Sequence, residues 1–294
     1  MKLVNFLATD GISLNGILYN SENETNKIIL AVHGMSSNCM KERDEIIAKQ
    51  ANKNNIDYFC FNNRGSELTK YIKRKTDGKK LLGGTSYEDV LEGYEDIKGA
   101  IIKLKELGYE EIYLQGHSLG CTKIVYTYNK LKSEKDEMLD SIKAVILLSL
   151  VDIPGTLNIY LGDKLNSYIG YAEKLEQEGK QNQLMPKEAF IHPVSVKTFL
   201  RYARDNEEIN FASYGKDTRL EKINNIDKPL FMRWGNVNEM ILQNAEDLVN
   251  MLNEIIKNPN KDINYIDGAD HGYKDRREEL AKQVINFIIK SADK

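Results

Sequence analysis

Residues 116–120 have the types and spacing of a serine nucleophile held in a tight turn. They read Gly-His-Ser-Leu-Gly, a match to the pattern G-x-S-x-G, with Ser118 at the centre. A strand-like apolar run at residues 111–114 precedes the motif, and a helical pattern follows it from about Cys121. A serine between a strand and a helix sits on a strained turn, and the flanking glycines let the strand and the helix pack closely. We therefore expect a nucleophile at Ser118, with an ordinary glycine-rich turn as the alternative.

A serine hydroxyl is a poor nucleophile at neutral pH and needs a base, most often a histidine. The chain has four histidines, namely His33, His117, His192 and His271. His271 follows the last strand-like run and precedes the last helical pattern. A base belongs at this place if the order along the chain is serine, acid, histidine. The sequence thus predicts His271 as the base and His192 as an ordinary residue of an inserted segment.

The elements that must position these residues alternate along the chain. Apolar strand-like runs alternate with helical patterns, which is typical of βα units on a mostly parallel sheet, and they lie at residues 28–32, 56–61, 111–114, 144–148, 229–234 and 263–266. The opening residues predict a β-hairpin around Asp10-Gly11. The alternation fails between about residues 154 and 228, which indicates an insertion. The predicted fold class is therefore α/β, with a mostly parallel central sheet flanked by helices.

Composition excludes several classes of protein. The 294 residues carry 41 lysines and arginines against 44 aspartates and glutamates, so a nucleic-acid binder that works by bulk charge is not expected. No apolar run approaches the roughly 20 residues that span a bilayer, and the first apolar stretch ends at Asp10, which favours a cytoplasmic protein. The three cysteines, Cys39, Cys60 and Cys121, lack metal-ligand spacing, so we expect neither a disulfide framework nor a metal site.

Four segments together resemble the α/β-hydrolase superfamily, and the resemblance spans nearly the whole chain. They are residues 28–35 (IILAVHGM), the GHSLG motif, residues 229–235 and Asp270-His271-Gly272. Residues 61–65 (FNNRG) and the extended motif GHSLGC are similar, more loosely, to the branch that includes fungal siderophore esterases. The resemblance implies a hydrolase core at residues 1–151 and 228–294 and a cap at residues 152–227, inserted after the sixth strand. It also implies that the backbone N–H groups of Met35 and Leu119 form an oxyanion hole.

The acid that would orient His271 departs from the pattern of this superfamily. The usual aspartate stands three residues after the glycine that ends the seventh strand, and here that position is Asn238, followed by Glu239. An amide orients the imidazole but cannot stabilise the imidazolium, and loss of the charge costs about 10⁴ in rate. We expect Glu239 as the acid, because its extra methylene compensates for a one-residue shift. Asp152, just after the sixth strand, is the second possibility. The third possibility is a site without a functional acid.

The predicted function is hydrolysis of a small-molecule carboxylic ester through an acyl-enzyme. Ser118 would attack, His271 would transfer the proton and Glu239 would steady the imidazolium, with no metal or organic cofactor. Thioesterases, peptidases and acyltransferases share these residues, and Asn238 also fits a hydrolase-fold protein that binds or senses a ligand without efficient catalysis. No nucleic-acid or membrane partner is expected, and no oligomeric state is favoured. Residues 70–80 include six lysines and arginines, which indicate either a solvated loop or contact with an anionic substrate.

Overall fold

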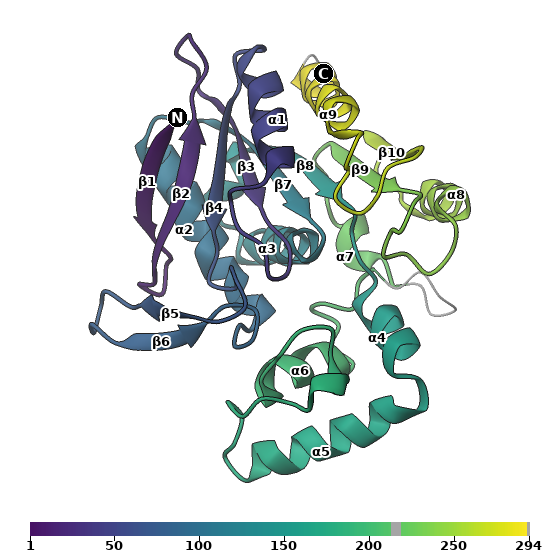
Figure 1. The fold of residues 1–294 in the computed structure, drawn as a ribbon. Helices are drawn as coiled ribbons and strands as arrows, with labels where there is room; N and C mark the ends of the chain where they lie inside the picture. The colour runs from purple at the N-terminus through teal and green to yellow at the C-terminus, as the bar shows by residue number, and fades with distance from the viewer. Residues whose placement is uncertain (213–218, 293–294) are drawn as a thin grey trace.

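The computed structural model describes residues 1–212 and 219–292, and its centre is an eight-stranded sheet (Figure 1). The strand order is β1-β2-β4-β3-β7-β8-β9-β10. The strands are β1 (Lys2–Leu7), β2 (Ser13–Tyr19), β3 (Lys27–Val32), β4 (Asp57–Asn62), β7 (Glu111–His117), β8 (Ile142–Leu148), β9 (Leu230–Gly235) and β10 (Lys261–Ile266). β1 pairs with β2 and β2 with β4 in antiparallel fashion, and the remaining neighbours are parallel. The mostly parallel sheet and the opening hairpin are therefore confirmed.

The residues of the strands explain their places in the sheet. β3 (KIILAV) and β8 (IKAVILL) are continuous apolar runs that are buried almost throughout, as expected of strands covered on both faces. β2, near the edge, alternates buried and more exposed residues instead. Both faces of β3 and β8 are thus covered, whereas one face of β2 is more exposed.

Helices cover both faces of the sheet (Figure 1). Helices α1 (Glu42–Asn52) and α9 (Arg277–Ala292) pack together in one apolar cluster on one face. Helices α2 (Gly93–Glu106), α3 (Leu119–Glu134) and α8 (Ala245–Ile255) contribute to a second cluster on the other face. Gly108 follows the end of α2 with a φ of +94°, a conformation that glycine adopts without strain. No helix in the described part of the chain is long and apolar enough to cross a membrane.

Residues 70–83 differ from the solvated loop that the sequence suggested. They form a small antiparallel sheet of β5 (Lys70–Lys73) and β6 (Lys80–Gly83), set apart from the main sheet (Figure 1). In β5 only Ile72 is buried, between the exposed Tyr71 and Lys73. A strand with a single buried apolar residue has little of the alternation that predicts strands from sequence.

A helical segment lies between β8 and β9. Its helices are α4 (Ile153–Leu161), α5 (Leu165–Gln177), α6 (Val196–Ala203) and α7 (Glu221–Asn224), and it also contains the short 3₁₀ turns Gly162–Lys164 and Lys187–Ala189. Two other 3₁₀ turns, Val90–Glu92 and Glu137–Ser141, lie before β8. Helices α4 to α6 share an apolar cluster distinct from the two that flank the sheet. Phe211 and Ile223, by contrast, pack in the second cluster, which lies on the face of the sheet covered by α2 and α3. Residues 213–218 of the predicted insertion and residues 293–294 of the predicted core lie outside the described residues.

Candidate active site

Ser118 lies in the sharp turn between β7 and α3. Its φ and ψ are 55° and −126°, a conformation that a non-glycine residue adopts only under strain. The Ser118 N–H donates to the carbonyl of Leu148 on the adjacent strand at 2.9 Å. A Cβ on Gly120 would lie 2.2 Å from the carbonyl oxygen of Val32, so the motif needs glycine at this position. The turn therefore projects the serine from the carboxyl edge of the parallel strands, where open α/β sheets bind ligands.

Glu239 and His271 come together from the ends of two neighbouring strands, β9 and β10. The Oε1 atom of Glu239 contacts the Nδ1 atom of His271. The Oε2 atom accepts hydrogen bonds from the N–H of Gly235 at 3.0 Å and from the hydroxyl of Ser149 at 2.8 Å. Burial raises the pKa of Glu239, but the hydrogen bond and charge of His271, together with these two donors, outweigh it and leave the pKa below its ordinary value. The carboxylate is therefore ionised at neutral pH.

The two alternatives to Glu239, Asn238 and Asp152, occupy special backbone positions. Asn238 has a φ of 49°, in the left-handed region that asparagine tolerates better than most residues. Asp152 is the N-cap of α4, where a carboxylate oxygen accepts the N–H of Gly155 at 3.0 Å. The structure thus brings Glu239 to His271 and places Asp152 at a helix terminus.

Ser118 and His271 line two cavities. The first, which we call the apolar cavity, has a volume of about 200 Å³. Apart from Ser118, His271, Thr156 and His192, it is lined by apolar and aromatic side chains, namely Met35, Leu119, Val151, Ile153, Leu157, Tyr160, Phe190, Ile191 and Met240. The second, which we call the cationic cavity, has a volume of about 250 Å³ and includes Lys41, Arg43 and Arg277. Ser118 and His271 thus lie between an apolar and a charged environment.

The predicted oxyanion-hole residues lie beside Ser118, and both line the apolar cavity. Met35 is on the loop after β3, which begins with the buried His33. The His33 ring donates from Nδ1 to the carbonyl of Gly34 at 2.8 Å, and Nε2 accepts the N–H of Asn63 at 3.3 Å. Burial, with the charge of Lys123, lowers the pKa of His33 to about 3, so the ring is neutral and can donate and accept at once.

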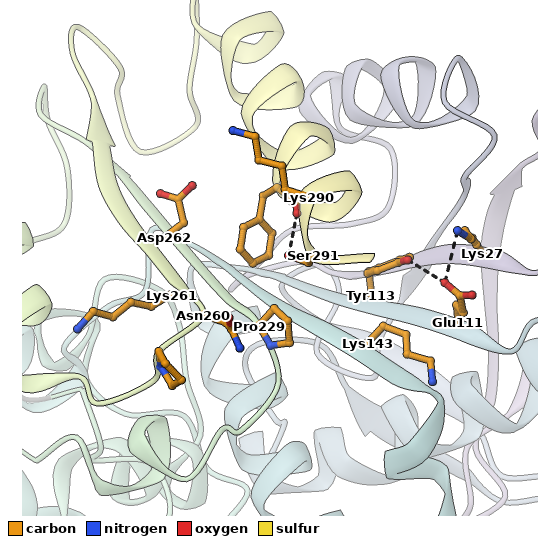
Figure 2. Close-up of a pocket in the computed structure, with 12 residues that line it drawn as sticks. Lys27, Glu111, Tyr113, Lys143, Pro229, Asn260, Lys261, Asp262, Lys290 and Ser291 are labelled. Atoms are coloured by element: carbon orange, nitrogen blue, oxygen red, sulfur yellow. Dashed lines mark hydrogen bonds and ion pairs between the residues drawn. The ribbon is translucent and has the colours of Figure 1, made fainter. Parts of the chain in front are cut away.

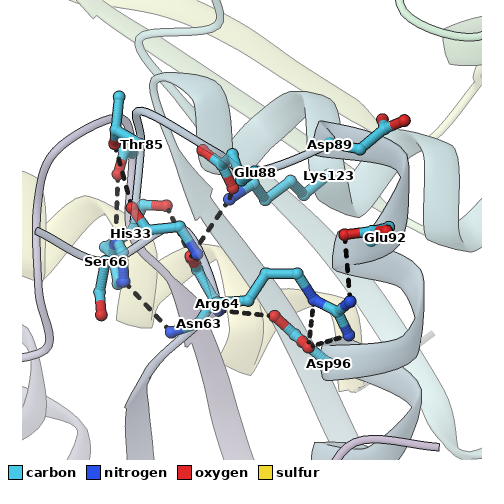
Figure 3. Close-up of polar contacts among 12 residues, drawn as sticks. His33, Asn63, Arg64, Ser66, Thr85, Glu88, Asp89, Glu92, Asp96 and Lys123 are labelled. Carbon is cyan, nitrogen blue, oxygen red and sulfur yellow. Dashed lines mark hydrogen bonds and ion pairs between the residues drawn. The ribbon is translucent and has the colours of Figure 1, made fainter. Parts of the chain in front are cut away.

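A buried polar network holds the loop after β3 in place (Figure 3). The hydroxyl of Thr85 accepts the N–H of Ser36 at 2.7 Å and donates to the carbonyl of Gly65 at 3.0 Å. Lys123 and Glu88, both almost fully buried, form an ion pair at 2.6 Å, and Lys123 also reaches the side chain of Asn63. These contacts fix the loop that carries Met35.

Arg64 belongs to the same network and has a structural role. Its guanidinium is buried and lies 2.8 Å from the carboxylate of Asp96, with Asp10 and Glu92 also within ion-pair distance. The Lys123–Glu88 pair was not predicted, because the sequence does not distinguish a buried lysine from an exposed one.

His117 and Ser149 also support the site, and sequence reasoning gave neither of them this role. The Nε2 atom of His117 donates to the carbonyl oxygen of His271 at 2.7 Å. Burial, followed by the charges of Arg43 and His271, lowers the pKa of His117 well below its ordinary value, which keeps the ring neutral. Ser149 follows β8 with a φ of 52°. The only possible signal for Ser149 was its position at the carboxyl end of a buried strand.

The cations of residues 70–80 do not line either cavity beside Ser118. Lys70 turns inward, and its Nζ atom donates to the carbonyl of Asn63 at 3.0 Å. Burial lowers the pKa of Lys70 to about 8. The segment whose charges suggested contact with an anionic substrate therefore lies outside both cavities that contain Ser118 and His271.

A wider cavity, of about 650 Å³, lies at the opposite edge of the sheet, where the parallel strands begin (Figure 2). Lys27, Glu111 and Lys261 are first residues of strands that line it, and Lys27 pairs with Glu111 at 3.7 Å. This cavity includes none of the predicted site residues. Across the described residues, no group of three or more His, Cys, Asp or Glu side chains is placed to hold a metal ion.

Comparison with known sequences gives one family match. A family model described as "Protein of unknown function (DUF1749)" matches residues 87–291, well over half of the chain. No curated protein matches the sequence significantly.

Comparison with solved structures gives esterases and related hydrolases. Est1E from Butyrivibrio proteoclasticus, solved with ferulic acid, has 17% identity and a TM-score of 0.66, with 98% of this chain and 99% of that chain covered. A highly thermostable carboxyl esterase from Bacillus coagulans has 13% identity and a TM-score of 0.69, with 98% of each chain covered. The α/β-hydrolase GrgF from Penicillium sp. sh18 has 15% identity and a TM-score of 0.66, with 99% and 98% covered. At these identities the likeness shows the fold, which is that of the α/β-hydrolases.

Proposed function

The chain belongs to the DUF1749 family and has the α/β-hydrolase fold, and on this basis we propose that it is a serine hydrolase that cleaves carboxylic esters. The observation that carries the proposal is the contact of Glu239 with His271, next to a cavity that also contains the strained Ser118. The esterases among the structures of similar fold support the same reaction class.

The reaction would proceed through an acyl-enzyme. The Oγ atom of Ser118, in the nucleophile elbow, attacks the ester carbonyl, and the Nε2 atom of His271 takes its proton and passes it to the leaving alcohol. The Glu239 carboxylate holds the Nδ1–H of His271 and stabilises the imidazolium. The N–H groups of Met35 and Leu119 hold the developing oxyanion, and loss of one such donor typically costs ~3 kcal/mol. Water then releases the acid by the same steps in reverse.

The helical segment would act as a cap over a hydrolase core of residues 1–151 and 228–294. Within the proposed cap, residues 152–227, helix α4 supplies Ile153 and Leu157 to the apolar cavity, and the loop before α6 supplies Phe190. The cap would therefore select the acyl group. The alternative of a binding protein without catalysis rested on Asn238, and it loses that support because Glu239 offers the charge that Asn238 lacks.

Labelling with a fluorophosphonate tests the proposal, because this reagent reacts only with an activated serine. We expect the wild type to be labelled and Ser118→Ala to remain unlabelled. Ser133→Ala, which removes an exposed serine on α3, is the matched control and should label like the wild type. Equal labelling of wild type and Ser118→Ala, or no labelling of either, contradicts the proposal.

A further inference from the structure

The cationic cavity adjoins the reacting residues but differs in character from the apolar cavity. The two share Met35, Ser118 and His271. The cationic cavity adds three cations, Lys41, Arg43 and Arg277, and one lining carboxylate, Glu42. Its positive side chains come from two segments that are distant in the sequence and that meet beside the serine.

Two helices begin at this cavity. Lys41 is the N-cap of α1, and Arg43 lies in its first turn. Arg277 is the first residue of α9, which packs beside α1 on the same face of the sheet (Figure 1). The first N–H groups of a helix have no partner within the helix and carry partial positive charge, so both helix ends favour an anion.

Arg43 and Arg277 each have an N–H donor that makes no hydrogen bond within the described residues. Arg43 is only 6% exposed, and its Nη2 atom lies 3.3 Å from both carboxylate oxygens of Asp44. Arg277 pairs through Nη1 with Glu42. Within the described residues, the Nε atoms of both arginines are buried and have no hydrogen-bond partner. Buried donors are nearly always satisfied in native proteins, so two unused guanidinium donors beside one cavity indicate a ligand that accepts hydrogen bonds.

We propose that the cationic cavity binds an anionic oxygen group of the substrate, a carboxylate or a phosphate. This inference rests on the proposed function. The planar guanidinium matches both groups. The other end of the substrate would fill the apolar cavity, whose volume of about 200 Å³ suits an acyl group on the order of six carbons, since a ~150 Å³ cavity holds benzene. The substrate class is then an ester that is apolar on one side of the scissile bond and anionic on the other.

Matched esters test the inference through kinetics. The hexanoate ester of 3-hydroxybenzoate is compared with that of methyl 3-hydroxybenzoate, in which a methyl ester replaces the charged carboxylate, and the release of hexanoate is measured for both. A second pair, phenyl hydrogen adipate and phenyl methyl adipate, places the charge on the acyl side. We expect kcat/KM to be about tenfold or more higher for the anionic member of one pair, since a hydrogen bond to a charged group is strong. The preferred pair tells which side of the ester is anionic. Equal kcat/KM within both pairs overturns the inference and leaves the proposed esterase intact.

Variants test whether the cationic cavity causes the preference for the anionic ester. In Arg277→Gln and in the milder Arg43→Lys, the ratio of anionic to neutral kcat/KM should fall toward one. Lys75→Gln removes an exposed cation of residues 70–80 and is the matched control, with an unchanged ratio. A ratio that falls in Lys75→Gln but not in Arg277→Gln overturns the assignment to this cavity.

A binding measurement separates this inference from the proposed function if no ester is cleaved. Calorimetry on wild type would use the stable amide 3-(hexanoylamino)benzoate, its methyl ester, and 3-(hexanoylamino)phenylphosphonate. Saturable binding of either anion, weakened in Arg277→Gln and absent for the methyl ester, supports the anion site even without hydrolysis. The anion that binds more tightly shows whether the cavity prefers a carboxylate or a phosphate. Binding that is equal for the anions and the methyl ester, or no binding of any of them, overturns it.

Discussion

Glu239 contacts the Nδ1 atom of His271 from the position just after Asn238. Its Oε1 atom faces the imidazole, while its Oε2 atom is held by the N–H of Gly235 and the hydroxyl of Ser149. The carboxylate is thus fixed at both oxygens. Because Nδ1 is engaged, the proposed mechanism assigns the proton exchange with Ser118 to the Nε2 atom of His271.

The first prediction concerns the charge of Glu239. We expect Glu239→Gln to lower kcat for ester hydrolysis by roughly 10² to 10⁴, because the amide orients the imidazole without stabilising the imidazolium. Asn238→Gly is the matched control, since glycine tolerates the φ of 49° at that position. Steady-state kinetics on folded variants is the measurement. A comparable loss of kcat in Asn238→Gly would contradict the assignment of Glu239 as the acid.

The second prediction concerns stability as a function of pH. The pKa of Glu239 lies below its ordinary value in the folded protein. A carboxylate with a depressed pKa stabilises the fold above its unfolded-state pKa of about 4.3, and this contribution is lost as the pH falls through the folded value. We therefore expect the unfolding free energies of wild type and Glu239→Gln to differ by a constant amount near neutral pH and to converge below about pH 4. Denaturant titrations at several pH values measure this, and a difference independent of pH would refute it.

Residues beside strong local patterns could be placed from the sequence, and others could not. β3 and β8 are continuous apolar runs that predict the sheet, and the strand-like runs at β7 and β10 placed Ser118 and His271 just after strand ends. Glu239 could be singled out by its charge and length. Ser149 could not, because its partner Glu239 is 90 positions away. The cationic cavity was missed for the same reason, since Arg277 and Glu42 are 235 positions apart and only tertiary packing joins them.

The third prediction assigns Ser149 as a positioning residue. Ser149→Ala removes a hydrogen bond to a charged carboxylate, and such bonds contribute about 1.5 to 3 kcal/mol. We expect kcat to fall about tenfold or more while KM stays unchanged, and the pKa of Glu239 to rise toward its ordinary value in the variant. Ser149→Gly also loses the hydroxyl but tolerates the φ of 52° without strain. If activity follows thermal stability across the two variants, rather than the loss of the hydroxyl, the role is merely structural.

The fourth prediction concerns the buried pair of Lys123 and Glu88. Lys123→Met leaves the Glu88 carboxylate buried without its partner at 2.6 Å, which should cost about 3 to 5 kcal/mol of unfolding free energy. The double variant Lys123→Met with Glu88→Gln should recover most of that loss, because no unpaired charge remains. Urea denaturation measures both. A double variant as unstable as Lys123→Met would mean that packing, and not charge, makes this pair important.

The fifth prediction concerns the length of the acyl group. Leu157 on α4 lines the apolar cavity and is 4% exposed, so Leu157→Ala should enlarge the cavity by most of one side chain. We expect the acyl length with the highest kcat/KM to increase by about two or three carbons, since each buried methylene contributes ~0.8 kcal/mol. Ile159→Ala, at a position of the same helix that is 71% exposed, is the matched control and should keep the wild-type preference. A series of 4-nitrophenyl esters from acetate to decanoate measures the shift. If Leu157→Ala lowers kcat/KM equally for every ester, α4 contributes to stability only, and the acyl group binds elsewhere.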